Sequence, residues 1–92
     1  RARVLLVVSE PDRVPVPPVG QLQGLMGLTL QEARLALLLA EGSELKEAAE
    51  SLGIGYETAR THLRSALAKA GVRRQGQLVA QVVAGGILGR RD

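Results

Sequence analysis

Residues 43–71 read SELKEAAESLGIGYETARTHLRSALAKAG, two stretches with helical spacing on either side of a glycine-containing corner. The corner, Gly53–Ile54–Gly55, predicts a tight turn, because glycine adopts backbone conformations that other residues avoid. The first stretch predicts a helix that is capped by Ser43 and continues through Leu52, and the second predicts a helix over residues 56–70. Two short helices joined by such a turn are typical of a helix-turn-helix.

The second helix of this pair has an apolar side and a polar side. Its apolar residues recur at helical spacing and form the side expected to pack on the domain: Ala59, Leu63, Ala66, Leu67 and Ala70. Arg60, Thr61 and Arg64 lie away from that stripe, and positions 60 and 64 are one turn apart on the same side. A protruding helix of this width fits the major groove of B-DNA, where arginine bonds guanine O6 and N7. The pattern therefore indicates a helix that faces DNA.

Two further helices complete a predicted four-helix domain. Thr29 and Glu32 match a capping box, which predicts a helix from residue 30 to Gly42 that is apolar nearly all round and covered on more than one side. Residues 75–83 predict the last helix, which we expect to fray at Gly85–Gly86. Residues 21–26 also fit a short helix that is broken near glycine 27.

The segment before the helices has a different composition. Residues 3–8, RVLLVV, are rich in β-branched residues and predict a short β-strand. Residues 14–20, VPVPPVG, contain three prolines and predict an extended linker. We therefore expect residues 1–20 to be the tail of an upstream domain and residues 21–92 to form the helical domain. The predicted fold class is all-α, with four helices preceded by one short β-strand and a proline-rich linker.

Charge is divided sharply along the chain. The net charge of the 92 residues is +3, but residues 58–92 hold seven Arg and Lys against one Asp, whereas residues 29–57 hold six Glu against two cations. This asymmetry favours one face turned toward a polyanion and another turned away from it. The basic loop residues Arg73 and Arg74 are predicted to face a nucleic-acid backbone.

Composition excludes several classes of function. The absence of cysteine removes a disulfide framework, a thiolate nucleophile and a cysteine-based zinc site. No apolar run has the roughly 18 residues that a membrane span needs. No nucleophile–base pair, metal cluster or glycine-rich phosphate loop is recognisable, so we expect neither an enzyme nor a cofactor. A cytoplasmic location fits these observations.

Residues 28–72 resemble the LuxR-type (NarL/FixJ-type) DNA-binding domain of bacterial transcription regulators. The family pattern runs Leu-Thr-x-x-Glu, Gly, Lys-Glu-x-Ala, Leu-x-Ile, Thr-Val-Lys-x-His and Lys-Leu-x-Val. It is matched here by Leu28, Thr29, Glu32, Gly42, Lys46, Glu47, Ala49, Leu52, Ile54, Thr58, Arg60, His62, Lys69 and Val72. One departure is Gly55, which stands where the family has a serine that caps the recognition helix.

The resemblance implies a function and a set of contacts. It implies base contacts from Arg60, Thr61 and Arg64, and it implies contacts with DNA phosphates from Lys46, Thr58 and Lys69. It also implies a homodimer through the fourth helix, whose apolar residues are Leu78, Val79, Val82 and Val83. Such domains follow a sensor domain, and RNA polymerase is a further candidate partner.

Two other readings remain open. A sigma-factor-like domain that reads promoters uses a similar recognition helix. A protein-interaction module would instead use the strand at residues 3–8 and the apolar stripe at residues 78–83, with the basic face incidental.

Overall fold

A computed structural model describes residues 18–89 of the chain. In this range the chain forms five α-helices and no strand: α2 (Val19–Met26), α3 (Leu30–Ala40), α4 (Leu45–Leu52), α5 (Tyr56–Ala70) and α6 (Gln75–Gly89).

The fold class is all-α as predicted, but the predicted number of helices is wrong, because residues 18–89 hold five helices in place of four. The predicted strand over residues 3–8 lies outside the described residues, as does most of the predicted linker. The end of that linker is helical, because Pro18 is the N-cap residue of α2 and its carbonyl accepts from the Leu22 N–H at 3.0 Å. Leu22 is buried in the core, so α2 belongs to the domain.

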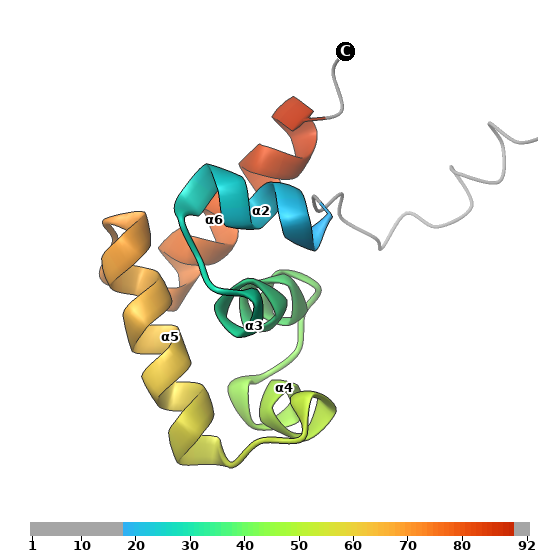
Figure 1. The fold of residues 1–92 in the computed structure, drawn as a ribbon, viewed down its shortest axis with the longest axis vertical. Coiled ribbons are helices and arrows are strands. Elements are labelled where there is room, and N and C mark those ends of the chain that lie inside the picture. Colours follow the sequence, from blue (N-terminus) through green and yellow to red (C-terminus); the bar gives the residue numbers. More distant parts are fainter. Residues whose placement is uncertain (1–17, 90–92) are drawn as a thin grey trace, which may run out of the picture.

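Helix α3 lies at the centre of the fold. It packs against each of the other four helices, and Figure 1 shows it nearly end-on between α2 and α6 above and α4 below, with α5 along its side. Its buried residues come from more than one side of the helix: Glu32, Ala33, Leu35, Ala36, Leu39 and Ala40. The prediction that this helix is covered on more than one side is confirmed.

The core consists of two clusters that share residues from α5 and α6. The larger cluster joins α2, α3, α5 and α6, and the smaller one joins α3 to α4. Leu63 of α5 and Val79 of α6 pack against both clusters. Many of the remaining core residues are alanines, so the helices approach closely without aromatic rings.

The predicted corner between α4 and α5 is confirmed. Gly53 ends α4 in the left-handed conformation, with φ of 71°, and the Ile54 N–H donates to the Ala49 carbonyl at 3.0 Å. Helix α5 has the predicted bounds, residues 56–70. The predicted cap of α4 is wrong by one residue, because Glu44 occupies the N-cap position in place of Ser43 and its N–H donates to the Glu47 carboxylate at 2.9 Å.

Helix α6 is longer than predicted. It continues through Gly85–Gly86 and ends at Gly89. Gly85 lies against α2, because a Cβ atom at this position would be only 3.3 Å from Leu25 Cδ1. We attribute the continuation of the helix to this close packing, which offsets the low helix propensity of glycine.

Because Ala59 is buried in close helix packing, a larger side chain at this position is expected to lower the stability of the fold. Ala59 is fully buried, whereas Ala68 on the same helix is exposed. Ala59→Leu is expected to lower the free energy of unfolding by about 1–3 kcal/mol through overpacking, whereas Ala68→Leu leaves it nearly unchanged. Urea unfolding followed by circular dichroism measures both, and equal stability of the two variants would contradict this packing.

Candidate nucleic-acid interface

Helix α5 presents one side to the domain and the other to solvent. Ala59 and Ala66 are buried, and Leu63 packs on both core clusters, so this side is held against α3 and α4. Figure 1 shows α5 running along the edge of the fold, past α3 and α4. The outward side is therefore free to meet a large ligand.

The predicted base-contacting residues share that outward side. Arg60, Thr61 and Arg64 are all exposed. Residues four apart differ by only about 40° around a helix with 3.6 residues per turn, so the two arginines project from one side. The Thr61 hydroxyl donates to the Glu57 carbonyl at 3.1 Å, which leaves its oxygen able to accept a further bond. We call Arg60, Thr61 and Arg64 the outer face of α5.

A carboxylate that the sequence analysis did not include borders the outer face. Glu57 Oε2 lies 3.4 Å from Arg60 Nη1, and the Glu57 side chain is 82 % exposed. The sequence could have predicted the pair of Glu57 and Arg60, because side chains at i and i+3 are neighbours on a helix.

Thr58 and Lys46 occupy different positions near this surface. Thr58 is exposed in the first turn of α5, where backbone N–H groups have no partner within the helix. Lys46 is exposed in the first turn of α4. The Glu47 carboxylate lies at the N-terminus of α4, where it accepts a hydrogen bond from the Glu44 N–H. A phosphate at the α4 N-terminus would therefore meet negative charge.

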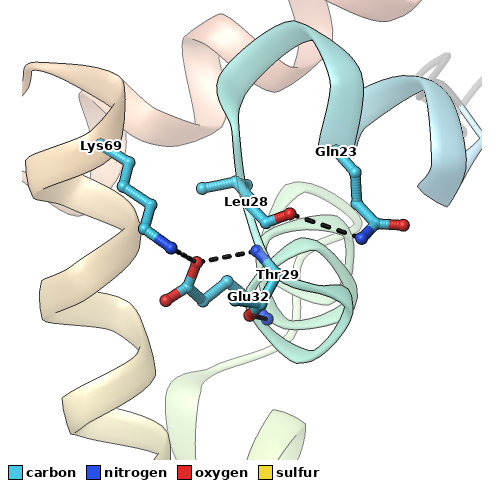
Figure 2. Close-up of polar contacts among 5 residues, drawn as sticks. All are labelled: Gln23, Leu28, Thr29, Glu32 and Lys69. Carbon is cyan, nitrogen blue, oxygen red and sulfur yellow. Dashed lines mark hydrogen bonds and ion pairs between the residues drawn. The ribbon is translucent and has the colours of Figure 1, made fainter.

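Lys69 is directed into the domain. Its Nζ lies 2.8 Å from Glu32 Oε1, and Figure 2 shows the ammonium reaching from α5 to the start of α3. Lys69 is nine residues after Arg60, which places it about 180° around the helix axis. The structure thus separates Lys69 from the outer face, although the resemblance grouped it with the phosphate contacts.

The partner of Lys69 also caps α3. Glu32 Oε1 accepts from the Thr29 N–H at 2.9 Å, while the Glu32 N–H donates to Thr29 Oγ1 at 3.2 Å (Figure 2). The predicted capping box is therefore confirmed. No local pattern predicts the ion pair, because its two residues are 37 positions apart.

Glu32 remains ionised although it is buried. Burial by itself raises the pKa of the carboxyl group. Hydrogen bonds from Lys69, Ser65 and the Thr29 N–H, together with the positive charge of Lys69, outweigh that effect and lower the pKa from 4.5 to about 2. The folded chain therefore holds a charged carboxylate where α3 begins.

Arg73 and Arg74 connect α5 to α6. Their backbone N–H groups both donate to Gln77 Oε1, each at 3.0 Å. This side-chain cap for α6 was not predicted. Both arginine side chains are exposed, which is compatible with the predicted contact with a nucleic-acid backbone.

The predicted dimer interface needs correction. Leu78 and Val82 are 0 % exposed and belong to the larger core cluster, so they have no surface left for a second copy. The helical spacing of these residues correctly indicates an apolar side of α6. That side packs on the chain's own core and not, as was predicted, on a second copy. Val79 and Val83 are half-buried, and dimerisation through them stays a prediction.

Residues 18–89 contain no group of three or more His, Cys, Asp or Glu side chains placed to hold a metal ion. None of the helices in this range has both the length and the hydropathy of a membrane span.

Comparison with models of protein families, with curated proteins and with solved structures found no match to this chain.

The Glu32 network predicts a specific dependence of stability on pH. Because the pKa of Glu32 is lowered on folding, its contribution is complete above about pH 4.5 and is lost as the pH falls toward 2. That contribution is about 2–3 kcal/mol, since half-exposed Lys69 is partly screened by solvent. Glu32→Gln should lower the free energy of unfolding by about this amount at pH 7 and flatten its pH dependence between 4.5 and 2.

Chemical unfolding across this pH range provides the measurement. Glu50→Gln is the matched control, because it removes an exposed carboxylate from α4. A Glu32→Gln variant with the pH profile of the unsubstituted chain would contradict the assigned role of this carboxylate.

Proposed function

We propose that the chain binds double-stranded DNA sequence-specifically, with α5 in the major groove, as the output domain of a bacterial transcription regulator. The observation that carries the proposal is the outer face of α5, where Arg60, Thr61 and Arg64 are exposed while the opposite side of the helix is packed. Arginine bonds guanine O6 and N7, and a helix of this kind fits the major groove. Such a regulator works in the cytoplasm.

Backbone contacts and base contacts have separate roles in this proposal. Thr58 and Arg74 supply phosphate contacts, which fix the position of the domain and provide affinity without reading sequence. Arg60 and Arg64 contact bases and so determine which DNA sequence is bound. Lys69 takes a positioning role, because its ammonium is bound to Glu32.

We further propose that two copies bind neighbouring half-sites. Two recognition helices about 34 Å apart meet the major groove on one side of the duplex. Val79 and Val83 on α6 are the interface residues that the fold leaves partly exposed. RNA polymerase stays a candidate partner of the assembled regulator.

One observation favours the alternative of a protein-interaction module. Leu25 of α2 is 59 % exposed and lies beside Gly85 of α6. This exposed leucine is a small apolar surface where α2 meets α6. The two functions are separable, because DNA binding would use α5 and protein binding would use this other surface.

Arg64→Ala tests the proposal against a matched control. Arg34→Ala removes the same charge from an exposed position on α3. Loss of a major-groove contact by Arg64→Ala should weaken binding to a selected operator by about 1–3 kcal/mol, whereas Arg34→Ala should have a much smaller effect. Fluorescence anisotropy with labelled duplexes over a salt series measures both.

Equal losses in the two variants would assign binding to net charge and not to α5. If the unsubstituted chain binds no duplex even at low salt, DNA binding is excluded, and the surface of α2 and α6 becomes the functional one.

A further inference from the structure

We infer that Glu57 is a specificity-determining residue of the recognition helix, one that accepts a hydrogen bond from cytosine N4 and disfavours other contacts. The inference rests on the proposed function, because it refines what the outer face of α5 reads. Glu57 is in the first turn of α5, and its side chain is 82 % exposed.

The position of Glu57 places its carboxylate among the base-reading groups. Its Oε2 atom is 3.4 Å from Arg60 Nη1, and its backbone carbonyl accepts from the Thr61 hydroxyl at 3.1 Å. Arg64 is seven residues further along and lies within about 20° of Glu57 around the helix axis. Any duplex that receives Arg60 and Arg64 in its major groove therefore receives this carboxylate as well.

Among the base edges of the major groove, cytosine N4 is the best partner for a carboxylate, because the other amino donor, adenine N6, lies beside the acceptor N7, which repels the carboxylate. Glutamate accepts from the exocyclic amino group of cytosine, whereas arginine donates to O6 and N7 of guanine. The neighbouring Glu57 and Arg60 thus offer an acceptor beside a donor, which matches the edge of a G·C pair or of adjacent G and C bases. Their mutual ion pair is exposed and weak, so the bases can replace it.

The same carboxylate lowers affinity for the wrong sequences. Phosphates and the acceptor atoms of guanine and thymine offer Glu57 no donor, and their negative potential repels it. The side chain also reduces the net charge of the outer face, so it weakens binding that depends only on charge. Glu57 is therefore expected to decrease non-specific affinity and to increase discrimination.

A simpler role for Glu57 is also testable. An acidic residue in the first turn of a helix interacts favourably with the helix dipole. That role predicts a change in stability when the charge is removed, with no change in the preferred DNA sequence. A readout of base preference separates the two roles.

The experiment is selection of duplexes from a randomised library by the unsubstituted chain, by Glu57→Gln and by Glu50→Gln. Glu50→Gln removes the same charge from an exposed position on α4 and serves as the control. The unsubstituted chain and Glu50→Gln should enrich cytosine at one position, with roughly 5- to 150-fold discrimination. Glu57→Gln should exchange that preference for adenine, which glutamine reads through N6 and N7, and should bind random duplex more tightly.

Two outcomes would overturn the inference and are distinguishable. If Glu57→Gln selects the same sequence as the unsubstituted chain, Glu57 does not read a base, although α5 still binds DNA. If the unsubstituted chain selects no sequence and binds no duplex, the proposed function fails together with the inference.

Discussion

The carboxylate of Glu32 is the interaction on which the arrangement of the helices most depends. It caps the first turn of α3 through Thr29 and accepts from Lys69 in the last turn of α5, 37 residues later. This one ion pair therefore joins the central helix α3 to α5. Because α3 packs against every other described helix, this ion pair links the last turn of α5 to the centre of the fold.

Small side chains make this arrangement possible without a large core. Ala48 of α4 and Ala59 of α5 are fully buried, and the two helices pack against each other. Close helix packing excludes water from such contacts and fixes the orientation of each helix. The outer face of α5 is thus presented by a rigid support, which is what a helix that reads base edges requires.

Local signals predicted several local features correctly, although the cap of α4 was misplaced by one residue. The Thr29 capping box, the Gly53 corner and the bounds of α5 follow from residues within a few positions of one another. Features that depend on distant residues were missed or misassigned. The pair of Lys69 with Glu32 has no local signature, and α6 continues past Gly85, where it lies against Leu25 of α2. The spacing of apolar residues in α6 indicated a buried side. Spacing alone does not distinguish burial in the chain's own core, where Leu78 lies, from burial against a second copy.

The claim that α5 carries the DNA-binding surface is tested most directly by nuclear magnetic resonance. Backbone amide shifts of the isotope-labelled chain, followed during titration with duplex DNA, report which helices meet the ligand. The account predicts the largest changes at Thr58, Arg60, Thr61 and Arg64, with small changes in α2 and in the second half of α6. Changes concentrated on α2 and α6, with the amides of α5 unaffected, would contradict it.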